Sequence, residues 1–205
     1  MDNYTTILGD GRFEYEDKKS VFLGFARPVS TENDALAFIA AVKKAYPDAR
    51  HHVYAYSLRE NSIARFSDDH EPQGTAGMPV LDAIRKNGCV DVVIVVVRYF
   101  GGVLLGTGGL VRAYSSAAVG AIKAGEIVTY SPYTTVEIKA SYSDYQKILP
   151  LLSKLSVRVN DTKFFDNVVV YASIKSDDSQ HLNDKLNEIA SGRIELKITG
   201  ESMEY

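Results

Sequence analysis

The chain has 205 residues, 45% of them hydrophobic and 24% charged, a composition that allows one large or two ordinary hydrophobic cores. Its formal net charge of −3 excludes a strongly basic nucleic-acid module, so an RNA contact would need a local patch. The longest apolar run, 92–97, is far shorter than the roughly 20 residues of a membrane helix, and a single cysteine excludes a disulfide framework. With a polar, acidic N-terminus unlike a signal peptide, we expect a cytoplasmic protein without a membrane partner.

Alternating strand and helix patterns predict a β-sheet with helices over residues 1–130. Apolar side chains recur at helical spacing from Ala35 to Tyr46, and Pro47 stops this helix. The run 92–97 is continuously β-branched, which is typical of a central strand buried on both faces. In order, we expect extended structure over 13–29, a helix over 35–46, strands over 52–58 and 63–66, a polar loop over 67–77, a helix with Pro79 near its first turn, the strand 92–97 and a helix over about 110–123.

A second pattern begins after Ser131-Pro132, which we take as the domain boundary. Strands and helices follow in the order βαββαβ, which predicts a ferredoxin-like plait. The expected fold is therefore α+β, with a first domain over 1–130 and a ferredoxin-like domain over 133–205. The predicted elements of the second domain are a strand over 134–140, a helix over 144–152, strands over 157–164 and 168–174, a helix over 179–189 and a strand over 194–199.

An acidic loop precedes the helix at Pro79 and is the first candidate site. Its carboxylates are Asp68, Asp69 and Glu71, followed by Thr75 and a run of small residues. Carboxylates so close together repel one another unless a cation or hydrogen-bond donors compensate. One interpretation is a binding loop for Mg²⁺ or for hydroxyl groups. The other is that the acids accept hydrogen bonds from local amides and cap the following helix.

A glycine-rich loop follows the apolar strand and is the second candidate site. A strand, a glycine turn and a helix N-terminus together present backbone N–H groups to a phosphate or carboxylate, and Arg98 or Arg112 could add a charged fork. The spacing matches neither a Walker loop nor the dinucleotide fingerprint. Alternatively, the glycines permit tight turns and close packing. The candidate residues are Gly101, Gly102, Gly106, Thr107, Gly108 and Gly109.

Two adjacent histidines begin the predicted strand 52–58. Successive strand residues point to opposite faces, so His51 and His52 make a poor metal pair. On this alternation His52 shares a face with Tyr54 and Tyr56. A hydrogen-bonding role for His52 is favoured over metal ligation.

Four motifs resemble the YigZ/IMPACT family: the segment 19–24, His52 with Ala55-Tyr56, the acidic loop from Asp68 to Gly77, and the long run from Arg98 to Tyr114. The resemblance implies a first domain similar to the second domain of ribosomal protein S5, and a C-terminal domain similar to the last domain of elongation factor G. Both comparisons point to translation. Eukaryotic members act by protein–protein contact, restraining the amino-acid-starvation kinase by competing for its activator.

The sequence departs from the usual family pattern at four positions. His70 stands where glycine is typical, Gln73 where serine is, Val97 where threonine is, and Leu104 where lysine is. The missing lysine removes a phosphate contact, and Gln73 excludes a catalytic serine at that position.

These observations favour a translation-associated regulatory or binding protein that contacts RNA, the ribosome or a protein partner through its first domain. The expected contact surface combines Asp68, Asp69, Glu71, Arg98, Arg112 and the glycine-rich backbone. The alternative is an enzyme acting on a nucleotide or small phosphorylated ligand, with the acids holding Mg²⁺ and the glycine loop holding phosphate. A third possibility is that both loops are architectural. The first two hypotheses require the two loops to meet in space.

Overall fold

The computed structural model describes residues 2–205, which form two compact units. One unit spans Tyr4–Thr129, and the other is built mainly from residues 130–205. The chain passes between them within one strand, β7 (Ile127–Ala140), beside the predicted boundary at Ser131-Pro132. Across the described residues no helix combines the length and apolarity that crossing a bilayer requires.

The first unit contains a five-stranded antiparallel sheet with the order β2-β3-β6-β4-β5. Its central strand β6 is buried from residue 92 through Arg98, in agreement with its apolar sequence, and extends two residues further than the run of β-branched side chains. The predicted extended segment 13–29 is two strands, because Lys18 and Lys19 turn the chain with positive φ angles of 46° and 65°. The strands are β2 (Gly11–Asp17), β3 (Ser20–Pro28), β4 (His51–Ser57), β5 (Ala64–Ser67) and β6 (Val92–Tyr99).

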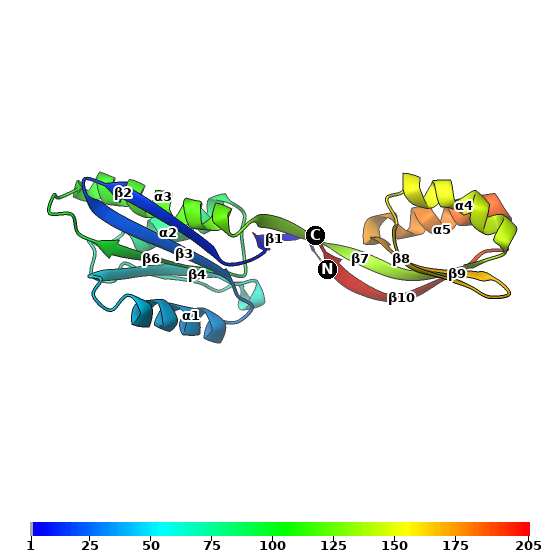
Figure 1. Cartoon of the computed structure of the whole chain (residues 1–205), viewed down its shortest axis with the longest axis horizontal. Coiled ribbons are helices and arrows are strands. Elements are labelled where there is room, and N and C mark those ends of the chain that lie inside the picture. Colours follow the sequence, from blue (N-terminus) through cyan, green and yellow to red (C-terminus); the bar gives the residue numbers. More distant parts are fainter. Residues whose placement is uncertain (1) are drawn as a thin grey trace. The chain divides into compact units, whose positions relative to one another are not determined.

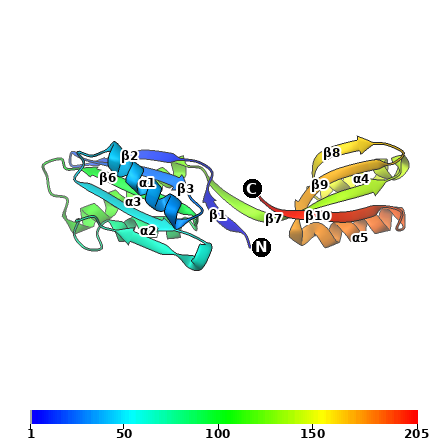
Figure 2. The ribbon, with the colours of Figure 1, turned by 90° about the horizontal axis from the view of Figure 1, so that it is seen from below.

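Helices cover both faces of this sheet (Figures 1 and 2). Helix α1 (Glu32–Ala45) packs on the face that includes Val93 and Val95, whereas α2 (Gly77–Lys86) and α3 (Gly106–Ala124) pack on the face of Ile94 and Val96. Strand alternation therefore divides β6 between two cores. A short strand β1 (Tyr4–Ile7) and a 3₁₀ turn η1 (Glu60–Ser62) complete the unit.

Helix α3 begins four residues before the predicted start at Leu110, so Gly106 to Gly109 form its first turn. Glycine disfavours helix, which made a loop the better prediction for these residues. The helix starts without a side-chain cap. The glycine-rich loop is therefore shorter than expected and ends at Leu105.

The second unit has the predicted βαββαβ order and an antiparallel sheet ordered β10-β7-β9-β8, which confirms the ferredoxin-like fold. Apolar side chains of β7 and β9, such as Ile138 and Val170, pack under the two helices through Ile148, Leu182 and Leu186. The elements after β7 are α4 (Tyr142–Lys154), β8 (Arg158–Phe164), β9 (Val168–Lys175), the 3₁₀ turn η2 (Ser176–Asp178), α5 (Ser179–Ala190) and β10 (Glu195–Glu204).

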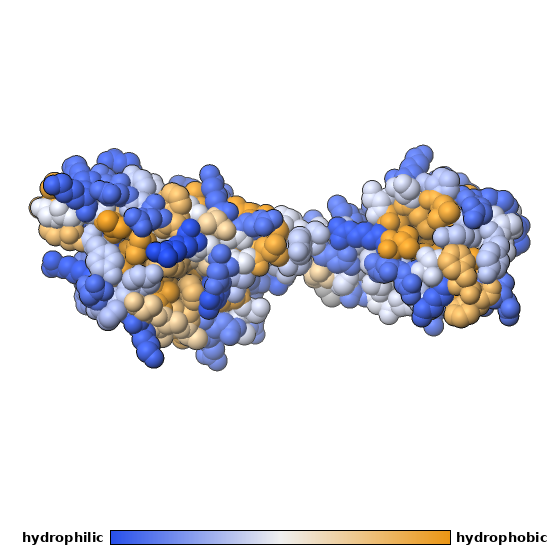
Figure 3. Space-filling model, viewed as in Figure 1, coloured by the Kyte–Doolittle hydropathy of each residue, from blue (hydrophilic) through white to orange (hydrophobic). Residues whose placement is uncertain are grey.

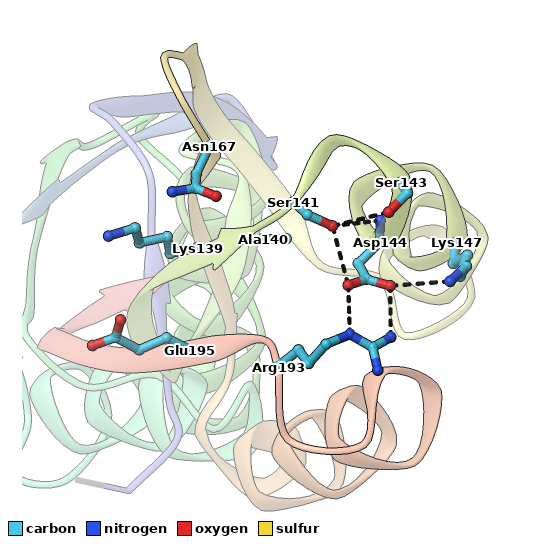
Figure 4. A pocket seen from close by; sticks show the side chains of 9 residues that line it. All are labelled: Lys139, Ala140, Ser141, Ser143, Asp144, Lys147, Asn167, Arg193 and Glu195. Carbon is cyan, nitrogen blue, oxygen red and sulfur yellow. Dashed lines mark hydrogen bonds and ion pairs between the residues drawn. The ribbon is translucent and has the colours of Figure 1, made fainter.

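A buried carboxylate joins the start of α4 to the connection between α5 and β10 (Figure 4). Asp144 accepts hydrogen bonds from Arg193 at 3.1 and 3.2 Å and from Lys147 at 3.0 Å, beside a polar cavity of about 620 Å³. Hydrogen bonds hold the pKa of Asp144 well below its ordinary value, although burial alone would raise it. The bonds from Arg193 have the largest effect, and the bond from Lys147 has the next largest. The carboxylate therefore stabilises the second unit in its ionised form.

We expect Asp144→Asn to destabilise the second unit at pH 7 and to reduce the change in its stability between pH 7 and pH 2.5. Because the folded pKa lies below the unfolded value of about 3.9, the carboxylate contributes stability above that value and loses the contribution as the pH falls through the folded pKa. Urea unfolding of wild type and variant at pH 7 and pH 2.5 measures this difference. Asp161→Asn on β8, an exposed carboxylate, is the control. Parallel pH profiles for wild type and Asp144→Asn would contradict the assignment.

Candidate functional site

Asp68 acts as the cap of helix α2 from within the acidic loop. One of its oxygens accepts hydrogen bonds from the amides of Ala76 and Gly77 at 3.1 and 2.7 Å, and the other accepts from Gly74 at 2.9 Å. Helix α2 has no capping side chain at Ala76 itself, so Asp68 satisfies amides that the helix start leaves open. The capping interpretation of the acidic loop holds for this residue. Thr75 is also internal to the loop, since its hydroxyl donates to the carbonyl of Pro72 at 2.6 Å.

Asp69 joins the acidic loop to the start of β4. Its carboxylate accepts the backbone N–H of His52 at 2.6 Å, and its carbonyl lies 2.8 Å from Nδ1 of His51. Nε2 of His52 lies 2.9 Å from the carbonyl of Tyr46, at the end of α1. Both histidines are thus used in hydrogen bonds to the backbone, which is the kind of role favoured for His52 from the sequence.

Glu71 is the centre of the site, because three segments distant in sequence meet at its carboxylate. It is 8% exposed, and its Oε1 accepts hydrogen bonds from Nη1 of Arg98 at 2.6 Å and from the hydroxyl of Tyr114 at 2.7 Å. Nε2 of His51 lies 3.8 Å from the same oxygen. Arg98 comes from β6 and Tyr114 from α3, so the acidic loop is fixed to both elements that flank the glycine-rich loop.

Tyr114 is held in the protonated form that this bond requires. Burial raises the pKa of its hydroxyl, and the negative charge of Glu71 raises the pKa further. The tyrosine therefore donates to Glu71 across the whole physiological range. Sequence reasoning missed this residue, since a tyrosine among small helical residues gives no sign of its distant partner.

The three acids do not form a common ligand set, because Asp68, Asp69 and Glu71 accept hydrogen bonds from different protein donors. Throughout residues 2–205 no three His, Cys, Asp or Glu side chains are grouped as metal ligands. A magnesium site in this loop stays a prediction that depends on rearranging these bonds.

The glycine-rich loop is anchored at Gly101, and the first turn of α3 that follows the loop is largely exposed. Gly101 donates its N–H to Oγ of Ser20 at 3.1 Å, and a Cβ there would lie 2.0 Å from the backbone of Lys19. Gly102 and Gly106 both have positive φ angles, which only glycine adopts easily. Arg112 is exposed on α3, as are Thr107 and Gly108 in the first turn, whereas Gly109 is buried.

Arg98 is not available as a surface contact, in contrast to the prediction. Its side chain is 8% exposed and pairs with Glu71, while the guanidinium carbon lies 5.4 and 5.7 Å from the ring centroids of Phe22 and Phe100. Its Nε atom has no hydrogen-bond partner among the described residues. Arg98 is buried because it pairs with Glu71, 27 positions away in the sequence. The alternation of residues along a strand does not predict such a contact.

The exposed part of the loop is apolar. Leu104 is 81% exposed, and Phe100 and Val103 are 48% and 47% exposed. We call these three residues the apolar tip. Figure 3 shows apolar surface of the first unit, at left, lying among hydrophilic side chains. Phe100, Val103 and Leu104 lie within the glycine-rich segment of the sequence. The candidate site predicted from the sequence includes the glycines of that segment but not these apolar residues.

Comparison with known proteins gives consistent matches along the chain. Residues 18–122 match the Impact N-terminal domain, and residues 138–193 match the domain of unknown function DUF1949. An IMPACT family member of Haemophilus influenzae is 35% identical over 91% of this chain and 92% of its own length. The IMPACT family member YigZ of Escherichia coli is 32% identical over 88% and 90%. A crystal structure of a hypothetical protein, 29% identical, covers 98% of both chains with a TM-score of 0.61.

We expect Arg98→Ala to destabilise the first unit by about 3–5 kcal/mol, because it leaves the buried Glu71 carboxylate without its cation. Urea unfolding followed by circular dichroism measures the loss. Arg27→Ala is the matched control: it breaks the exposed Arg27–Asp10 ion pair, for which at most about 1 kcal/mol is expected. Equal effects of the two substitutions would show that Glu71 does not depend on Arg98.

Proposed function

Because this chain belongs to the IMPACT family, we propose that it is a translation-associated binding protein whose first unit contacts a protein partner through the apolar tip. The observation that carries the proposal is the 81% exposure of Leu104 beside two further exposed apolar side chains. Adjacent exposed apolar residues mark interaction sites more often than single ones do. Loops on a fixed framework are where binding residues concentrate.

A protein surface suits this tip better than RNA does. RNA binding depends on Lys and Arg near the phosphates. The tip carries no cation, with Leu104 in the place where lysine is typical of the family, and Arg98 is committed to Glu71. Burying one leucine side chain contributes roughly 1.5–3 kcal/mol, which makes Leu104 with Val103 sufficient to dominate a contact.

The anchored base of the loop supports the same function. Glu71 fixes β6 and α3, and Gly101 lies against the backbone of Lys19, so both ends of the short loop are held. A loop with fixed ends loses less conformational entropy when it binds. The acidic loop then serves to position the contact surface and does not form part of it.

We expect the double substitution Val103→Ser with Leu104→Ser to weaken association with purified ribosomes at least tenfold in co-sedimentation, without lowering Tm. Both side chains are exposed, so their replacement removes contact area with little effect on folding. Ile198→Ser, at a 60% exposed site in the second unit, is the matched control. A photo-crosslinker placed at Leu104 should label a protein component of the ribosome or of a bound factor.

Three outcomes would contradict this proposal. One is no association of the wild-type chain with the ribosome or its factors. The second is unchanged association of the double variant. The third is crosslinking to RNA together with a salt-dependent loss in Arg112→Ala, which would assign the contact to RNA.

A further inference from the structure

The outer edge of strand β2 borders an apolar groove that is separate from the apolar tip. Strand β2 is the last strand of its sheet and pairs only with β3 among the described residues (Figure 2). The groove, of about 760 Å³, lies between β2 and α3. Phe13 and Tyr15 line one wall, and Val119 and Lys123 lie on the other. An unpaired edge beside an apolar groove is the arrangement to which extended peptides add as strands.

Two cations of α3 lie at this groove: Lys123 lines it, and Arg112 lies about one helical turn before Ser116, which also lines it. Helix α3 contains two cations, Arg112 and Lys123, and no acidic residue. Neither cation has a hydrogen bond or ion pair among residues 2–205, and no acidic side chain lines the groove. The charged residues of β2, such as Glu14 and Glu16, alternate with Phe13 and Tyr15 and therefore project from the opposite face.

We propose that this groove binds an extended, acidic segment of a partner protein, which adds to β2 as a further strand. Its apolar side chains lie against Phe13, Tyr15 and Val119, and its carboxylates pair with Arg112 and Lys123. The alternation of a strand places successive side chains on opposite faces, so every second residue of the segment enters the groove.

The spacing of the two cations defines the sequence that fits. Arg112 and Lys123 are eleven positions apart, close to three helical turns, so they share one face of α3. Their separation along the helix is about 16 Å at 1.5 Å per residue. An extended chain covers about 16 Å in about five residues. The acidic residues of the partner segment are therefore about four or six positions apart, because only residues an even number of positions apart share the face that enters the groove.

A single strand fits this edge better than a second copy of the chain. Helix α3 lies closely over β2: a Cβ on Gly120 would be 2.1 Å from the ring of Phe13, and one on Gly11 would be 2.0 Å from the carbonyl of Ala121. An antiparallel pair of β2 strands would place the α3 helices of both copies on one face of the joined sheet. Each helix carries Arg112 and Lys123 and no acidic residue, so a second copy brings like charges together, whereas an acidic segment supplies the opposite charge.

Selection of a phage library of random 12-residue peptides on the full-length chain tests the proposal. We expect enriched peptides with alternating apolar residues and acidic residues about four or six positions apart. Fluorescence anisotropy with a synthetic enriched peptide should show at least tenfold weaker binding to Val119→Asp, and to Arg112→Gln with Lys123→Gln. Alternate backbone N–H groups of an added strand face β2, and the others face solvent. Methylating the backbone nitrogens of the peptide at the positions that face β2 should therefore abolish binding, whereas methylating the other set should not.

Matched controls separate this groove from other surfaces. Lys139→Gln with Lys154→Gln, two exposed cations of the second unit, should leave binding unchanged. So should the Val103→Ser and Leu104→Ser substitutions, so this inference and the proposed function can fail separately. The surface substitutions at Arg112 and Lys123 keep the test valid should Val119→Asp not fold.

Several results would overturn the inference. Enrichment of no peptide, or of peptides without acidic residues, would exclude an acidic segment. Binding that tolerates both methylation sets would exclude strand addition. A dimer in sedimentation equilibrium that Val119→Asp dissociates would assign the groove to a second copy of the chain.

Discussion

The carboxylate of Glu71 is the interaction on which the working end of the first unit depends. A buried carboxylate is costly unless charged and hydrogen-bonding partners compensate, and Arg98 and Tyr114 supply them. Because these partners belong to β6 and α3, one side chain fixes the acidic loop to both flanks of the glycine-rich loop. The geometry of the apolar tip follows from this junction.

The two loops divide their roles in a way that composition alone did not indicate. The charged residues of the motifs are internal: Asp68 caps α2, Asp69 holds the start of β4, and Arg98 pairs with Glu71. The exposed residues are apolar, with Leu104 the most prominent. The acidic loop meets the two elements that flank the glycine-rich loop, β6 and α3, through a buried ion pair and a tyrosine hydrogen bond and not through a cradle of free acids and amides. This arrangement favours protein contact over magnesium-dependent chemistry, which stays a prediction.

Local patterns predicted the elements well, and long-range contacts explain what they missed. The β-branched run 92–97 predicted the central strand, and the βαββαβ order predicted the plait of the second unit. The predicted start of α3 at Leu110 was wrong, because the low helix propensity of glycine argued for a loop. In the structure the helix begins at Gly106 and includes Gly106 to Gly109. The partner of Glu71 lies 43 positions away at Tyr114, a contact that no periodicity encodes. The groove beside β2 could not be predicted without the strand order of the sheet, which shows that β2 is an edge strand.

Hydrogen exchange measured by mass spectrometry on wild type and Glu71→Gln tests the central claim, that one carboxylate fixes both loops. The substitution keeps the size of the side chain and removes its charge, so Arg98 loses its anion. If the account is correct, amide protection falls together in residues 67–76 and 100–109, while β8 to β10 of the second unit stay unchanged. Loss of protection confined to 67–76, with 100–109 as in wild type, would contradict it.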